Sequence, residues 1–110
     1  MIEMKTKAKG AAFFYEPTAD GGFWIRFGRG HERIVSGADV RRLVNHFRGS
    51  EVALGTSRTN PPPGSVGAWL QEEVTPIAIA SYLGPILVRE GYAEWADRST
   101  LRFVGSGSGR

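Results

Sequence analysis

Turn-forming residues interrupt this chain so often that only short strands and helices can form. Its 110 residues include 15 glycines and 6 prolines. Two clusters, Pro17–Gly22 and Gly28–Gly30, suit tight turns because proline presets φ and glycine adopts positive φ. The segments around them are rich in aromatic and β-branched residues and predict three strands: Ala11–Glu16, Phe23–Phe27 and His31–Val35. We expect a three-stranded antiparallel meander, preceded by nine residues that form a loose arm or the start of an edge strand.

A capped helix is predicted after the third strand. Ser36 and Asp39 have the spacing of a capping box, in which the serine hydroxyl accepts a hydrogen bond from a backbone N–H of the first turn. An apolar stripe follows at helical spacing: Val40, Leu43, Val44 and Phe47. Gly49 stands where glycine commonly ends a helix. The two flanks of the stripe carry Arg41, Asn45 and Arg48 on one side and Arg42 and His46 on the other. We expect this helix to pack on the meander and to present guanidinium groups to solvent.

The middle of the chain predicts a connector between two halves. Residues 51–54 have the composition of a short further strand, and residues 55–64 (GTSRTNPPPG) form a loop that three consecutive prolines stiffen. Ser65 suits the N-cap of a short helix. Glu73 falls within the apolar stripe of that helix, so it needs an arginine partner or an exposed, frayed helix end.

A largely apolar helix is predicted over residues 76–90. Thr75-Pro76 suits its start, since threonine is a good N-cap and proline a good first helical residue. Gly84-Pro85 either kinks this helix or divides it in two, because an interior proline removes a backbone hydrogen bond. Two short strands then form a hairpin, over residues 92–95 and 100–104.

These elements predict an α+β fold. We expect a three-stranded antiparallel meander packed on a capped helix, followed by short helices and a C-terminal hairpin. A hydrophobic content of 41% and a charged content of 23% are typical of a globular protein. We expect one domain over residues 1–104, with the proline-rich loop 55–64 inside it and a flexible tail over residues 105–110.

The sequence contains no pattern for catalysis, a metal site or a cofactor. It has no cysteine, which excludes disulfides, thiol catalysis and cysteine-ligated metals. Its two histidines, His31 and His46, are too few for a metal site unless carboxylates complete it. HExxH, GxSxG, Walker A and GxGxxG motifs are all missing. We expect a non-enzymatic protein without a cofactor. No apolar run approaches the ~20 residues of a membrane span, and the basic N-terminus leads into no apolar signal segment, so we expect it in the cytoplasm.

Residues 65–104 resemble a winged helix-turn-helix: a helix, a tight turn, a second helix ending in LVREGY (87–92), and a two-stranded ribbon. The resemblance implies that the second helix enters the DNA major groove and that the ribbon is the wing. However, apolar side chains cover more than half the circumference of that helix. No Arg, Lys, Asn or Gln near its N-terminus is available to read bases. Over a DNA-reading helix we therefore favour a buried central helix or one face of a homodimer.

Positive charge is concentrated in the middle of the chain. Between residues 26 and 58, seven arginines stand against three acidic residues, whereas residues 59–110 have a slight negative excess. Guanidinium groups suit phosphates, and Trp24, on the same strand face as Arg26, would stack on a base of a single strand. We predict a nucleic-acid-binding face formed by nine residues: Trp24, Arg26, Arg29, His31, Arg33, Arg41, Arg42, Arg48 and Arg58.

An alternative interpretation assigns the same residues to the structure of the domain. Trp24 would pack beneath the capped helix, and the arginines would pair with Glu32, Asp39 and Glu51. The chain would then be a protein–protein interaction module, or a homodimer that uses the apolar helix 76–90 or an exposed strand edge, and would bind no nucleic acid. We prefer a small binding module of a regulatory kind that contacts nucleic acid through residues 26–58. Its size, arginine bias and lack of catalytic patterning are similar to those of orphan proteins of bacterial mobile elements, such as integron gene cassettes.

Overall fold

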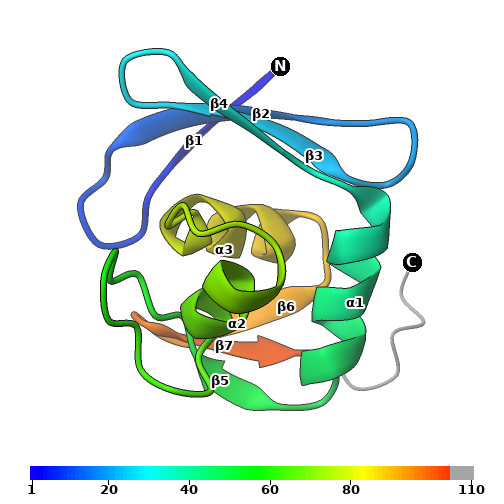
Figure 1. Cartoon of the computed structure of the whole chain (residues 1–110), viewed down its shortest axis with the longest axis vertical. Coiled ribbons are helices and arrows are strands. Elements are labelled where there is room, and N and C mark those ends of the chain that lie inside the picture. Colours follow the sequence, from blue (N-terminus) through cyan, green and yellow to red (C-terminus); the bar gives the residue numbers. More distant parts are fainter. Residues whose placement is uncertain (105–110) are drawn as a thin grey trace.

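The structure of the chain, a computed structural model, describes residues 1–104. It has an α+β fold in which two antiparallel sheets lie on either side of a layer of helices (Figure 1). The predicted tail, residues 105–110, lies outside the described residues. Among the described residues, no helix is both long enough and apolar enough to cross a membrane.

The first sheet is a meander of four strands: β1 (Ile2–Lys5), β2 (Ala12–Pro17), β3 (Phe23–Phe27) and β4 (His31–Val35). The predicted meander had three strands, and the difference is β1, which the N-terminal residues form by pairing with β2. Of the two alternatives for the N-terminal residues, a loose arm or an edge strand, the structure has the edge strand. Pairing with β2, and not local strand propensity, accounts for it. Alternate side chains point to opposite faces, so Phe13, Tyr15 and Ile25 are fully buried toward the helices.

Helix α1 (Gly37–Phe47) begins and ends as predicted. The Ser36 hydroxyl accepts a hydrogen bond from the Asp39 N–H at 3.1 Å, and Gly49 has a φ of 74°. The predicted stripe is its buried face: Val40, Leu43, Val44 and Phe47. Asp39 does not complete the capping box, and its carboxylate instead pairs with Arg42 at 2.9 Å.

The turn between β2 and β3 is fastened to the start of α1 by Asp20. One carboxylate oxygen accepts hydrogen bonds from the Thr18 hydroxyl and the Gly22 N–H, and the other accepts one from the Gly37 N–H. These bonds, that from Thr18 first, lower the pKa of Asp20 to about 2. A Cβ on Gly37 would lie 1.9 Å from the Asp20 carbonyl oxygen, so only glycine permits this approach.

The second sheet has the order β5-β7-β6, with β5 (Glu51–Ala53), β6 (Ala93–Asp97) and β7 (Thr100–Phe103). The predicted short strand at residues 51–54 is present and pairs with β7. The predicted C-terminal hairpin is also present, and β5 extends it to three strands.

Helices α2 (Val66–Glu73) and α3 (Ala80–Arg89) start differently. The Ser65 hydroxyl caps α2, as predicted, by accepting a hydrogen bond from the Ala68 N–H at 3.1 Å. The predicted start of the apolar helix at Thr75-Pro76 is wrong, because α3 follows Ile79, which provides no side-chain cap. Ile79 is itself 1% exposed, so burial of the first turn, and not a cap, sets where α3 begins. Pro85 lies inside α3 without dividing it.

Helix α3 lies between the two sheets and forms the centre of the core (Figure 1). Leu83, Ile86 and Leu87 are fully buried. Tyr82, in the first turn, stacks on Phe27 of β3 with ring centroids 4.4 Å apart. Of the two alternatives that we favoured, the helix is the buried central one, and its apolar side chains already contact other parts of the chain.

Candidate functional site

Four connections between elements gather on one side of the molecule. The β1–β2 loop and the β3–β4 turn lie at the same end of the first sheet, because its neighbouring strands are antiparallel. The β1–β2 loop also reaches the second sheet, where Lys7 Nζ lies 4.9 Å from the ring centre of Trp95. The β6–β7 turn meets the start of the proline-rich loop, since the Leu54 N–H donates to the Ser99 carbonyl at 2.8 Å. This is the left side of Figure 1.

This side of the molecule is strongly basic. We call residues 5–12, 26–32, 55–60 and 97–99 the basic end. It holds two acidic residues and seven basic ones: Lys5, Lys7, Lys9, Arg26, Arg29, Arg58 and Arg98. The rest of the described chain holds six basic and nine acidic residues, so the net charge of the protein conceals a separation of charge. Within residues 1–104, no carboxylate forms an ion pair with any cation of the basic end.

The two carboxylates of the basic end are held by hydrogen bonds. Glu32 accepts one from the indole N–H of Trp24 at 3.2 Å. Asp97 accepts one from the Ser99 N–H at 2.8 Å, and this bond is the main reason that the pKa of Asp97 is lowered. Both acids therefore have partners other than the seven cations.

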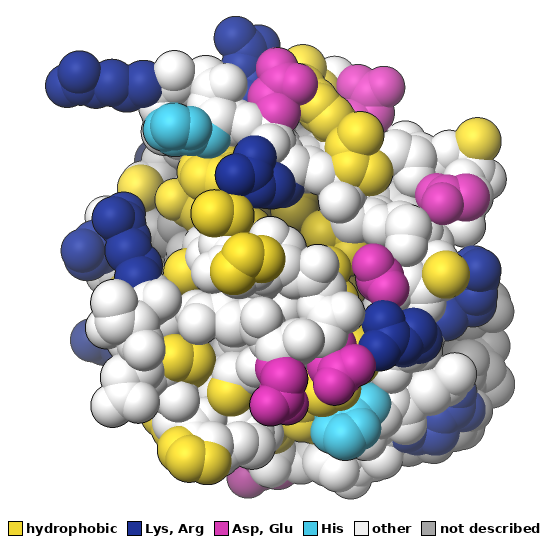
Figure 2. Space-filling view, viewed as in Figure 1, with side chains coloured by type: hydrophobic (Ala, Val, Ile, Leu, Met, Phe, Trp, Pro, Cys, Tyr) yellow, Lys and Arg dark blue, Asp and Glu magenta, His cyan; other side chains and the backbone are white. Residues whose placement is uncertain are grey.

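Three aromatic rings form a ladder at the basic end, on the face of the first sheet that packs on α3. The ring centroids of His31 and Phe27 are 5.8 Å apart, and those of Phe27 and Tyr82 are 4.4 Å apart. His31 is exposed, whereas Phe27 and Tyr82 are half-buried. Arg33 lies on the same strand face as His31, one position further along the face. Figure 2 shows apolar side chains in a hollow beneath the upper sheet, with basic side chains and a histidine around it.

The structure brings together only part of the predicted nucleic-acid-binding face. Arg26, Arg29, His31 and Arg58 belong to the basic end, and Arg33 adjoins it. Trp24 shares the outward strand face of Arg26, as predicted, and it does not pack beneath the capped helix as the alternative interpretation required. That outward face is opposite to the one that carries the aromatic ladder.

The remaining three predicted residues lie on α1, which runs along the other side of the molecule (Figure 1). The guanidinium group of Arg41 approaches the Asp20 carbonyl at 3.4 Å. Arg48, at the end of α1, donates a hydrogen bond to the Asn45 side chain. Arg42 pairs with Asp39 of its own helix and with Glu73 of α2. The nine predicted residues therefore do not form one surface.

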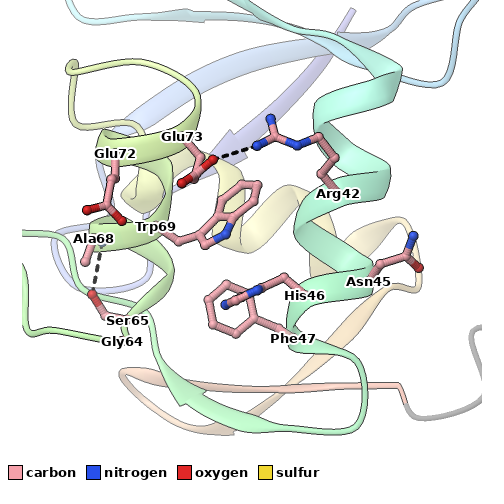
Figure 3. Close-up of a pocket in the computed structure, with 10 residues that line it drawn as sticks. All are labelled: Arg42, Asn45, His46, Phe47, Gly64, Ser65, Ala68, Trp69, Glu72 and Glu73. Carbon is pink, nitrogen blue, oxygen red and sulfur yellow. Dashed lines mark hydrogen bonds and ion pairs between the residues drawn. The ribbon is translucent and has the colours of Figure 1, made fainter.

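A groove of about 720 Å³ separates α1 from α2, and Arg42 lies at one end of it (Figure 3). Arg42 pairs with Glu73 at 2.7 Å, and its guanidinium carbon is 5.3 Å from the ring centre of Trp69. The sequence predicted an arginine partner or an exposed helix end for Glu73, and the structure shows both: Glu73 pairs with Arg42 and is exposed at the last residue of α2. His46 lies beside the same indole, with ring centroids 5.8 Å apart. In this groove the guanidinium group of Arg42 already has a carboxylate partner, Glu73, and an aromatic partner, Trp69, within the same chain.

Sequence reasoning missed Lys5, Lys7, Lys9 and Arg98. The three lysines were visible, but the charge of residues 1–25 sums to zero when Glu3, Glu16 and Asp20 are included. Folding the chain at its hairpins separates these groups, because Glu16 and Asp20 lie toward the other end of the first sheet. Grouping charges by hairpin connection, and not by sequence interval, would have found the lysines.

Within residues 1–104, no three histidine or acidic side chains come together as metal ligands would. Comparisons with family models, with curated proteins and with solved structures found no match to the chain.

Proposed function

We propose that the basic end binds single-stranded nucleic acid and that this is the function of the protein. The observation that supports the proposal most is the gathering of seven lysines and arginines from four connections, with no carboxylate paired to any of them. Phosphate groups supply most of the affinity of nucleic acid for proteins, and cations without internal partners are free to neutralise them. A regulatory role and an origin on a bacterial mobile element stay predictions.

The aromatic ladder favours a single strand over a duplex. Base–aromatic stacking needs an unpaired base, and His31 presents the exposed end of a ladder that Phe27 and Tyr82 continue inward. A duplex read by a helix would need α3 at the surface, as the winged-helix resemblance implies. Six of the ten residues of α3 are buried between the sheets, so the proposal does not use that helix.

The experiment is fluorescence anisotropy of a labelled single-stranded oligonucleotide of mixed sequence, titrated with the protein at several salt concentrations. We expect binding that weakens steeply as salt rises, because each phosphate contact releases counterions. Lys9→Glu with Arg29→Glu should weaken binding at least tenfold. The matched control, Arg41→Glu with Arg48→Glu, makes the same change of charge on α1 and should leave most of the affinity intact.

The ladder has its own test. His31→Ala should weaken binding by about 1–3 kcal/mol, as loss of one base–aromatic stack does, without changing the salt dependence. His46→Ala in the groove between α1 and α2 is the control and should change nothing. No binding at low salt, or equal losses from the two charge-reversal pairs, would show that the basic end is not a nucleic-acid site. A duplex bound more tightly than the single strand would contradict the role of the ladder.

A further inference from the structure

Two tryptophan rings of residues 1–104 have a cation over them, and the two cations are held differently. Lys7 Nζ lies 4.9 Å from the ring centre of Trp95, and the guanidinium carbon of Arg42 lies 5.3 Å from that of Trp69. Two carboxylates also hold Arg42, at 2.9 and 2.7 Å. Within the described residues, Lys7 has neither an ion pair nor a hydrogen bond from its side chain. Cation–π attraction, which is weak at an exposed site, is therefore all that keeps its ammonium group at Trp95.

The loop that carries Lys7 has a well-defined backbone but leaves the lysine side chain free to move. The Thr6 N–H donates to the Ala11 carbonyl at 2.9 Å, and the Thr6 carbonyl accepts from the Gly10 N–H at 3.0 Å. The Ala11 N–H donates to the Thr6 hydroxyl at 3.0 Å. Lys7 itself is exposed, and a lysine stem is flexible. Its ammonium group can therefore leave the Trp95 ring without a change in the fold.

Trp95 offers a nucleobase both a ring face and a hydrogen-bond donor. The ring is half-buried and packs on the core, with Lys7 over it. In residues 1–104 its indole N–H has no hydrogen-bond partner, and no buried side-chain nitrogen or oxygen lacks one, so this N–H is in contact with solvent. The Trp24 N–H, in contrast, already donates to Glu32. Movement of Lys7 away from the ring would uncover an aromatic face with an unused donor at its edge.

The charges around Trp95 favour a phosphate chain. On the same strand, Glu94 points to the opposite face and pairs with Arg102 at 3.4 Å. Asp97 accepts a hydrogen bond from the Ser99 N–H at 2.8 Å. Both acids next to Trp95 on β6 therefore have partners of their own, whereas Lys7 lies over the ring and Arg98 follows in the β6–β7 turn.

We propose that Trp95 is a second base-stacking position of the basic end and that Lys7 covers it until nucleic acid binds. On binding, the ammonium group of Lys7 moves from the ring to a phosphate, and an unpaired base stacks on the ring. The exchange is favourable because a base–aromatic stack contributes more than an exposed cation–π contact, and because the ammonium group gains a charged partner. Trp69 cannot act in this way, since carboxylates hold Arg42 in place. The position rests on the proposed nucleic-acid binding, to which it adds a place for a base on the second sheet.

The experiment is fluorine NMR of the full chain labelled with 5-fluorotryptophan, which gives one resonance for each of the three tryptophans. The protein is titrated with the single-stranded oligonucleotide of mixed sequence used for anisotropy. The Trp95 resonance should shift and should reach saturation at the same oligonucleotide concentration as the anisotropy. The Trp69 resonance is the internal control and should stay in place. Single Trp→Phe substitutions assign the resonances.

Two variants separate the roles of the ring and the ammonium group. Trp95→Leu keeps an apolar side chain without an aromatic face, so it should weaken binding roughly tenfold and leave the salt dependence unchanged. Trp69→Leu is the matched control and should keep the wild-type affinity. Lys7→Met should flatten the slope of log affinity against log salt by about 0.7, since one phosphate contact is lost. It should also shift the Trp95 resonance of the protein without oligonucleotide.

The outcomes distinguish this stacking position from the proposed function. An oligonucleotide that binds by anisotropy but leaves the Trp95 resonance unmoved would overturn the stacking position alone, as would equal affinities of Trp95→Leu and Trp69→Leu. A wild-type salt dependence in Lys7→Met would overturn the movement of the ammonium group to a phosphate. Absence of binding at low salt would overturn both the proposed function and the stacking position. The resonance of the unsubstituted chain decides the matter if Trp95→Leu loses its fold by circular dichroism.

Discussion

The two ends of the first sheet use their charged residues in different ways. At the end near the start of α1, the Asp20 carboxylate accepts hydrogen bonds from two backbone N–H groups and a hydroxyl. In the middle of the sheet, the Tyr15 hydroxyl donates to Glu90 at 2.6 Å and joins β2 to the end of α3. At the basic end, by contrast, six of the seven cations have no ion pair, hydrogen bond or ring contact with another side chain of the described residues.

This difference separates charges that hold the fold together from charges that are available to a ligand. A carboxylate that accepts several hydrogen bonds stabilises the native state through them, so replacing that residue should lower the free energy of unfolding. A solvated lysine or arginine without a partner contributes little to stability, and its loss should change binding alone. Substitutions of the hydrogen-bonded groups should therefore lower stability strongly. Substitutions of cations at the basic end should weaken nucleic-acid binding and leave stability nearly unchanged.

The largest effect on stability is expected from Tyr15→Phe. It removes a partly buried hydrogen bond to a carboxylate, and bonds to charged groups contribute about 2 kcal/mol. Burial, and then the bond to Glu90, raises the pKa of Tyr15 to about 12. This contribution is complete below pH 10, the ordinary pKa of tyrosine, and is lost as the pH rises through 12. Denaturant unfolding should show a lower free energy of unfolding at neutral pH and a weaker loss of stability between pH 10 and 12.

Tyr92→Phe is the control for that experiment, because no described residue forms a hydrogen bond with the Tyr92 hydroxyl. It should leave both the free energy of unfolding and its alkaline dependence close to those of the wild type. Equal losses in the two variants would mean that the bond to Glu90 does not join the sheet to α3 in solution.

A smaller loss of stability is expected from Asp20→Asn. The amide oxygen still accepts hydrogen bonds, but the charge that strengthens them is gone. Because the folded pKa of about 2 lies below the ordinary aspartate pKa of 3.8, this contribution is present above pH 3.8 and is lost as the pH falls through 2. Thermal unfolding should therefore give a lower Tm than the wild type at neutral pH, with the difference closing in acid. Glu16→Gln, which removes one negative charge at the same end, should not reproduce this acid dependence.

Arg42→Gln should have a weaker effect still. Arg42 is the paired cation of the α1–α2 groove, but it and Glu73 are both exposed, and exposed ion pairs contribute at most about 1 kcal/mol. The guanidinium group lies over Trp69, so the tryptophan fluorescence should change even where the unfolding midpoint hardly moves. The control is Arg42→Gln in a protein that already carries Trp69→Phe. The fluorescence change should vanish there, which would assign it to the Trp69 ring.

The smallest effect on stability is expected from Lys9→Glu with Arg29→Glu, the pair that should reduce oligonucleotide binding at least tenfold. Both residues are exposed in connections at the basic end, and surface substitutions of this kind change stability by less than about 0.5 kcal/mol. Denaturant unfolding of the double variant should overlay that of the wild type. A stability loss as large as that of Tyr15→Phe would remove the distinction between the two ends.

Local signals predicted most of the secondary structure and some of the candidate site. The side-chain hydroxyl of Ser36 caps the start of α1, and Gly49 ends that helix with a positive φ. The Ser65 hydroxyl caps the start of α2 in the same way as Ser36. Its position in an apolar stripe predicted that Glu73 would have an arginine partner or an exposed helix end, and it has both. The start of α3 was not predictable from caps, since the Thr75-Pro76 signal was overruled by the burial of Ile79.

The sequence by itself determined the turns, the caps and the apolar faces, because these depend on residues within a few positions of one another. It also determined that the protein has no cysteine and so forms no disulfide. Only the tertiary structure decided that β1 joins the meander, that α3 is covered by sheets on both sides, and that three lysines near the N-terminus lie with Arg29, Arg58 and Arg98. These are contacts between residues far apart in the chain, and they follow from how hydrophobic faces pack, which no local pattern encodes.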